Sequence, residues 1–128
     1  MTLSLSAAVA ACAILACLAV FQAALIGGAP WGRLAWGGQH KVLPPRLRAG
    51  SALSIVLYAV FGYAAAAQAG LVMPLVDKSV LSISMWVLTA YFALGVIMNG
   101  ISRSRPERLV MTPTALILAA CYLVLALS

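Results

Sequence analysis

Four long apolar runs, separated by short polar stretches, set the pattern of this chain. Each run is a continuous block of Ala, Leu, Val and Ile, without the alternating polarity that is typical of a membrane β-strand. A helix needs roughly 20 apolar residues to cross about 30 Å of hydrocarbon. The pattern predicts an all-α membrane protein, a single domain of residues 1–128 with four transmembrane helices in an antiparallel bundle. The predicted spans are residues 3–26, 45–71, 80–101 and 107–128.

Prolines predict where the second span begins and ends. Pro44 and Pro45 suit a first helical turn, because the N–H that proline lacks would have no intrahelical partner there. Met73 and Pro74 are expected to end the element, so the helix is predicted to run to about residue 71.

Two starts are open for the fourth span. Ser104 and Glu107 have the S-x-x-E spacing of a capping box, with Pro106 in the first turn, and a helix that starts there would kink at Pro113. Alternatively, Thr112 caps a shorter helix that has Pro113 at its first position.

Small side chains recur at helical spacing along one face of each of the first two spans, and such faces let helix backbones approach closely in lipid. The first face consists of Ala8, Cys12, Ala16, Ala19 and Ala23, and the second of Ser51, Ser54, Tyr58, Gly62, Ala65 and Ala69. Contact within one hairpin needs only one of them. The face of the first span is therefore expected to join copies into a dimer or larger homo-oligomer. A single copy of four thin helices is expected to enclose little volume.

Composition and charge agree with a membrane location and add an orientation. Hydrophobic residues make up 65% of the chain and charged residues only 8%, against about 25% charged in soluble domains. Seven of the eight basic residues lie in the loops after the first and third spans, and only Lys78 lies in the tight turn on the opposite side. Basic residues in short loops stay on the cytoplasmic side. Both termini are therefore predicted to lie outside the cytoplasm.

The loop after the first span concentrates the unusual chemistry. Residues 27–48, GGAPWGRLAWGGQHKVLPPRLR, hold five of the ten glycines, two of the three tryptophans, the only histidine and four of the eight basic residues. Such a surface attracts anions, and a loop of this length could dip back into the membrane where protein covers its backbone. The plainer alternative is that the basic residues only fix orientation and touch anionic lipid nonspecifically, at about 1 kcal/mol each.

The sequence offers little catalytic chemistry. The body of each span lacks the Asp, Glu, His, Lys or Arg that proton relays and ion-coupling sites need. One histidine, two carboxylates and three scattered cysteines form no metal-ligand set, and no cofactor is expected. His40 and Glu107 are the only cytoplasmic titratable groups besides the basic residues, so the chain is predicted not to be an enzyme. Glu107 is interpreted instead as a helix cap or as a partner of Arg46 or Arg48.

Candidate binding residues lie at the predicted cytoplasmic face, in the two basic loops and the adjoining helix ends. They are Gln22, Trp31, Trp36, His40, Arg46, Arg48, Asn99, Glu107 and Arg108. They favour binding or translocation of a small or lipid-like anionic ligand, with anionic lipid headgroups as partners and no nucleic acid. Gln22 has a second interpretation, an interhelical hydrogen bond. The alternative functions are a structural or accessory membrane subunit and, with less support, a lipid-modifying enzyme.

Two segments carry a resemblance to known proteins. FQAALIGGAPWGRLAWGGQHKVLPPRLRAGS and NGISRSRPERLVMTP resemble a family of small, uncharacterised bacterial four-span membrane proteins. The signature of that family is G-A-P-W-G, G-G, L-P and R, followed by N, S-x-S, E-R and P, and the resemblance covers nearly the whole chain. It implies a bacterial inner-membrane location and names no substrate. It also draws attention to Gln22, Arg46, Arg48, Asn99, Glu107 and Arg108.

Overall fold

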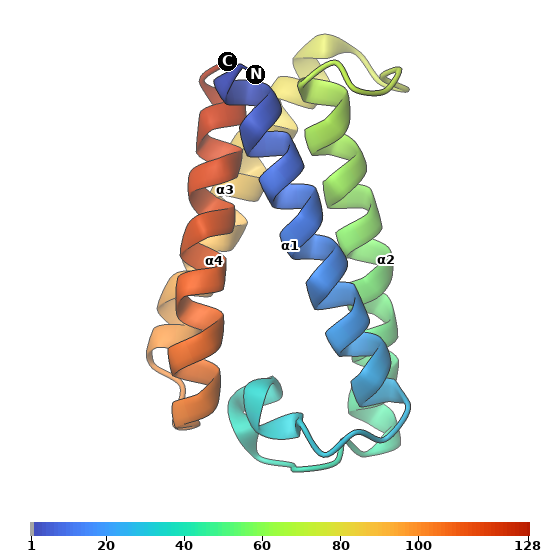
Figure 1. Ribbon diagram of the computed structural model, residues 1–128, viewed down its shortest axis with the longest axis vertical. Coiled ribbons are helices and arrows are strands. Elements are labelled where there is room, and N and C mark those ends of the chain that lie inside the picture. The colour runs from blue at the N-terminus through green and yellow to red at the C-terminus, as the bar shows by residue number, and fades with distance from the viewer. Residues whose placement is uncertain (1) are drawn as a thin grey trace.

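The computed structural model describes residues 2–128, and its regular secondary structure over that range is entirely helical. Each of the four long helices is long and apolar enough to cross a membrane, and successive helices run in opposite directions (Figure 1). The predicted fold, an all-α membrane protein with four transmembrane helices in an antiparallel bundle, is confirmed. The elements are α1 (Leu3–Ile26), the 3-10 turns η1 (Gly32–Leu34) and η2 (Trp36–Gly38), α2 (Pro45–Gln68), α3 (Lys78–Gly100) and α4 (Arg105–Ala126).

Glycines in the left-handed region end the first two helices. Gly28 has φ +96°, and the N–H of Ala29 behind it donates to Ala24 O at 3.0 Å. Gly70 has φ +81° and repeats this arrangement at the end of α2. Both are Schellman caps, which need a residue that adopts positive φ without strain. The predicted end of the second helix near residue 71 is therefore slightly late, because Gly70 stops the helix before Met73 and Pro74.

The fourth helix uses the earlier of its two predicted starts. α4 begins at Arg105 with Pro106 in its first turn, and it continues through Pro113. The shorter helix capped by Thr112 is therefore wrong. Proline is tolerated within a membrane helix where neighbouring groups satisfy the freed backbone.

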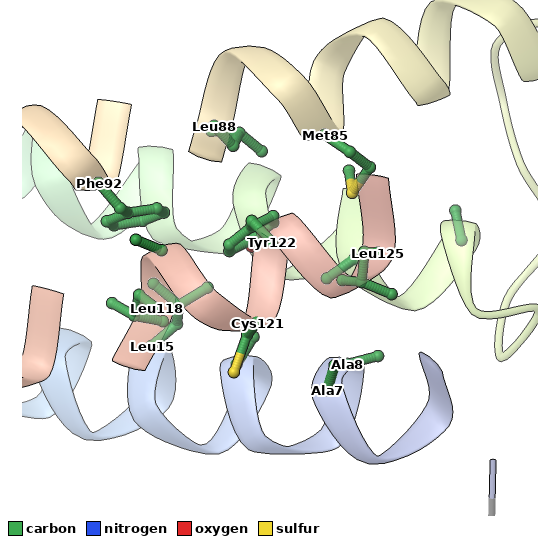
Figure 2. Packing of buried hydrophobic residues seen from close by; sticks show 14 of the residues in the cluster. Ala7, Ala8, Leu15, Met85, Leu88, Phe92, Leu118, Cys121, Tyr122 and Leu125 are labelled. Atoms are coloured by element: carbon green, nitrogen blue, oxygen red, sulfur yellow. The ribbon is translucent and has the colours of Figure 1, made fainter. Parts of the chain in front are cut away.

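The helices form two close pairs that meet at one end of the bundle. α1 packs along α2 and α3 packs along α4, and both chain ends lie at the same end of the molecule (Figure 1). We call this the terminal end, and the opposite end, which carries residues 27–44, the loop end. The main core lies toward the terminal end, where Tyr122 is fully buried (Figure 2). Its ring stacks on Phe92, with 5.4 Å between ring centroids.

The predicted small-residue faces are used within the chain. Ala8 is fully buried, and the Cys12 thiol donates to Gly62 O on α2 at 3.4 Å. On the same predicted face, Ala16 and Ala23 are exposed. The residues of α1 that pack against other helices therefore differ in part from the predicted face. The buried residues of α1 are Ala7, Ala8, Ala11, Leu15, Gln22 and Leu25. The stripe around Cys12 is therefore not a spare surface, and homo-oligomer formation stays a prediction without it.

We expect Tyr122→Phe to lower stability by about 0.5–1.5 kcal/mol. The Tyr122 hydroxyl donates to Phe61 O on α2 at 2.6 Å and so ties α4 to the other helix pair. Phenylalanine keeps the stacked ring and removes only this bond. Tyr63→Phe is the matched control, because the Tyr63 hydroxyl donates to Met73 O in the exposed connection after α2. Reversible unfolding in mixed detergent measures both variants, and equal losses would contradict the structural role of the Tyr122 hydroxyl.

Candidate functional site

The long loop, residues 27–44, folds under the bundle at the loop end (Figure 1, cyan). Three side chains form a small second core there: Leu25 at the end of α1 and Ala35 and Leu43 in the loop. The loop also closes on itself, since the Gly32 N–H donates to Lys41 O at 2.8 Å. The loop is therefore a packed element rather than a free connection.

Trp36 joins the long loop to α2. Its indole N–H donates to Ser51 Oγ at 3.2 Å, and its ring lies on Gly50, where an added Cβ would come within 2.7 Å of the ring. The Trp36 backbone has φ +53°, an uncommon conformation for a bulky residue that surrounding contacts must hold in place. Gly50 and Ser51 supply those contacts, so the first turns of α2 determine where this part of the loop lies.

Two side chains of the predicted capping box hold the loop against α4 instead of capping it. Ser104 is the N-cap residue of α4, yet its side chain makes no cap bond and donates to Arg33 O. Glu107 Oε2 accepts a hydrogen bond from the Gly37 N–H at 3.2 Å. The predicted capping box is therefore wrong, because the Ser104 and Glu107 side chains form hydrogen bonds with the backbone of the long loop instead of with the backbone at the start of α4.

The predicted pairing of Glu107 with an arginine is also wrong. Arg48 Nε donates to Leu43 O at 2.8 Å and so closes the end of the loop. Arg108 Nη1 donates to Ser102 O at 2.9 Å in the connection between α3 and α4. Within residues 2–128, the Glu107 carboxylate forms its hydrogen bond with a backbone N–H and forms no ion pair, although only 6% of the residue is exposed.

A cavity of about 520 Å³ lies between the two helix pairs above the long loop, and we call it the inter-helix cavity. Four of the predicted site residues line it: Gln22, Trp36, Asn99 and Glu107. The cavity is open along one side of the bundle rather than enclosed, so the expectation that one copy encloses little volume stays a prediction. Gln22 is 7% exposed, and its buried Oε1 has no hydrogen-bond donor within residues 2–128.

A second hollow of about 540 Å³ lies outside the long loop, and we call it the arginine hollow. Three exposed arginines line it: Arg33 from the long loop, Arg103 from the connection between α3 and α4, and Arg105 at the start of α4. The backbone of Gly37 and Gly38 forms part of the wall, and both residues have positive φ. The other lining residues are Gln39, Ser104 and Pro106. This hollow concentrates positive charge at the loop end.

Comparisons of this chain with protein-family models, curated proteins and solved structures found no match. The resemblance to the bacterial four-span family therefore stays a prediction, and the site is interpreted from its own geometry.

The remaining predicted site residues lie outside both hollows. Trp31 is half-exposed, His40 is half-buried in the loop and Arg46 is exposed at the start of α2. Arg48 and Arg108 are engaged with backbone carbonyls, as described above. Sequence reasoning missed Arg33, Arg103 and Arg105, which line the arginine hollow instead. The only available signal was that both basic loops lie at one end of the bundle.

None of the three cysteines lines either hollow. All three cysteines are free thiols, and Cys121 points from α4 toward α1 within the main core (Figure 2). Within residues 2–128, no group of three or more His, Cys, Asp or Glu side chains is placed to hold a metal ion.

Proposed function

We propose that this multi-pass membrane protein binds a small or lipid-like anion in the arginine hollow, at the cytoplasmic face of a bacterial inner membrane. The observation that carries the proposal is the convergence of Arg33, Arg103 and Arg105 on one concave surface. Guanidinium groups present forked N–H donors that match phosphate and carboxylate oxygens. The hollow is the place at the loop end where such a group meets three cations at once.

Arg33 is held at the wall of the same hollow, because its Nη1 donates to Gly38 O at 3.0 Å. The Gly37 N–H donates to the Glu107 carboxylate and the Gly38 N–H donates to Ala35 O, so these two backbone donors of the turn already have partners. The arginine side chains therefore supply the hydrogen-bond donors for the proposed anion.

Charge separates the roles of the two hollows. Glu107 lines the inter-helix cavity, whereas the three arginines line the arginine hollow on the other side of the loop. An anion inside the cavity would face a carboxylate, and like charges at close range are unfavourable. The proposed anion therefore binds at the surface of the loop end rather than between the helices, and the proposal is binding rather than passage through one copy.

Paired arginine variants test the proposal against nonspecific attraction. The protein is reconstituted in phosphatidylcholine nanodiscs with added phosphatidylglycerol, and native mass spectrometry measures the phosphatidylglycerol retained. Arg103→Gln combined with Arg105→Gln should reduce retention about tenfold or more, which equals about 1.4 kcal/mol. Lys41→Gln combined with Arg46→Gln removes the same charge from exposed positions of the same end and should have a much smaller effect.

The outcomes separate the rival functions. Equal losses in both double variants would mean that the basic residues act only as a diffuse positive surface. Added inorganic phosphate that displaces the lipid would identify a free anion as the ligand, and failure to displace it would identify a lipid headgroup. Absence of any retained anion would favour the structural or accessory role. The prediction that the chain is not an enzyme stays a prediction.

A further inference from the structure

Two buried side chains that line the inter-helix cavity have unused capacity to accept hydrogen bonds, Gln22 and Glu107. Gln22 Oε1 is buried without a partner, and Glu107 is a buried carboxylate whose hydrogen bond comes from a single backbone N–H. Asn99 is half-buried and also lines the cavity, and its Nδ2 donates to Gly95 O at 2.7 Å, which leaves its Oδ1 for another donor. Buried polar groups are normally paired, so the unpartnered Gln22 oxygen and the buried Glu107 carboxylate together favour a ligand that donates hydrogen bonds.

The three acceptors lie at nearly the same depth in the bundle. Gln22 lies one turn before the end of α1 at Ile26, which corresponds to about 6 Å along the helix. Asn99 is in the last turn of α3 and Glu107 is in the first turn of α4. Polar side chains from three different helices therefore line the cavity near the loop end.

The rest of the wall is mostly apolar and aromatic, and Ser54 and Thr114 are its other polar residues. Five aromatic side chains line the cavity: Phe21, Trp36, Tyr58, Tyr91 and Phe92. Faces of aromatic rings attract organic cations, most strongly where water is excluded. The volume of about 520 Å³ falls within the range of about 300–1,000 Å³ that small-molecule sites occupy.

Access to the cavity lies along α3. The lining residues Tyr91, Leu94 and Met98 are half or more exposed, so the wall is open on this side, where a transmembrane helix faces lipid. Trp36, Met98, Asn99 and Glu107 also line a smaller hollow of about 290 Å³ at the loop end. An apolar ligand thus has a lateral entrance, and its polar end meets Glu107 near the loop.

We propose that the inter-helix cavity binds a lipophilic amine in its protonated form, with the Glu107 carboxylate as counter-charge and Gln22 as a hydrogen-bond acceptor. The ammonium group can donate hydrogen bonds to the Gln22 oxygen and the Glu107 carboxylate, and its positive charge compensates a carboxylate that has no ion pair within residues 2–128. This site goes beyond the anion site of the arginine hollow, because its ligand carries the opposite charge and enters from a different side of the loop.

A pair of probes that differ only in charge tests this proposal. Dansylcadaverine carries a primary ammonium group on an apolar fluorophore, and its N-acetyl derivative is neutral. Fluorescence titration in phosphatidylcholine nanodiscs, corrected with empty nanodiscs, should show that the ammonium probe binds at least about tenfold more tightly than the neutral one. Glu107→Gln should remove most of this preference and leave affinity for the neutral probe unchanged. The amide keeps an oxygen for the Gly37 N–H, so the loop stays in place.

Two further variants complete the test. Asp77→Asn removes the other acidic residue of the chain, at the terminal end, and should leave both affinities unchanged. Gln22→Leu should weaken the ammonium probe several-fold and strengthen the neutral probe. Equal affinities for the two probes, or equal effects of Glu107→Gln and Asp77→Asn, would overturn the amine site. Arg103→Gln combined with Arg105→Gln should maintain or increase amine binding, because positive charges that repel the ammonium group are removed. The anion site and the amine site can therefore fail independently of each other.

Discussion

Gly38→Ala should detach the long loop from α4 and lower stability by about 2–4 kcal/mol. Gly38 is buried with φ +71°, and a Cβ there would collide with the side chain of Ser104. Alanine in the left-handed region costs about 1–2 kcal/mol. Forcing an extra methyl group into a packed contact costs typically about 1–3 kcal/mol more. Reversible unfolding in mixed detergent measures the loss of stability. Stronger quenching of Trp36 fluorescence by a water-soluble quencher would report detachment of the loop.

Two controls separate backbone strain from collision. Gly37 has a similar φ of +74°, but a Cβ at Gly37 would meet nothing within 4 Å, so Gly37→Ala should show only the backbone cost. Ser104→Gly removes the colliding atoms and should restore part of the stability of Gly38→Ala. Ser104→Gly also removes the hydrogen bond to Arg33 O, which costs about 0.5–1.5 kcal/mol, so the restored stability is measured relative to the Ser104→Gly single variant. Additivity of the two changes would show that Gly38 and Ser104 are not in contact.

Cysteine labelling in intact cells should give an all-or-none result for the two ends of the bundle. Asp77→Cys is introduced after replacement of Cys12, Cys17 and Cys121 by alanine, and it should react fully with an impermeant maleimide. Gln39→Cys, in the long loop, should react only after the cells are opened. Both positions are exposed, so accessibility within the protein does not differ. The expectation follows from the concentration of basic residues at the loop end, because short loops rich in lysine and arginine stay on the cytoplasmic side.

Labelling at Gln39→Cys in intact cells would reverse the proposed orientation. The arginine hollow would then face away from the anionic cytoplasmic leaflet, which would remove the lipid-headgroup version of the proposed function. The amine site would be unaffected, since its ligand enters through the side of the bundle.

Local patterns were sufficient to predict the fold of this chain. Continuous apolar runs of the right length predicted four helices, and prolines at residues 45 and 106 predicted two of the starts. The end of α2 was predicted late because Met73 and Pro74 were read as the stop and Gly70 was not. Gly70 was the stronger signal, since a glycine at the C′ position closes a helix with two backbone hydrogen bonds.

The site was predicted only in part, because its geometry depends on contacts between distant segments. Gln22, Asn99 and Glu107 could be placed together by their depth in the spans, and the structure brings them to one cavity. The partners of Ser104 and Glu107 could not be predicted, since the same S-x-x-E spacing describes a capping box and a loop contact. The arginine hollow followed from that loop contact, and so Arg33, Arg103 and Arg105 were overlooked.

The hydrogen bonds that hold the loop to α4 have a consequence for the order in which the protein is made. They join Gly37 to Glu107 and Ser104 to Arg33, positions 70 and 71 residues apart. The ribosome completes α1, the loop and α2 long before α4 exists, so the first hairpin is made while the Gly37 N–H and the Arg33 carbonyl still lack their α4 partners. Docking of the last helix then completes both hollows in a single late step. A chain interrupted before α4 keeps the loop contacts to α1 and α2 but has neither hollow.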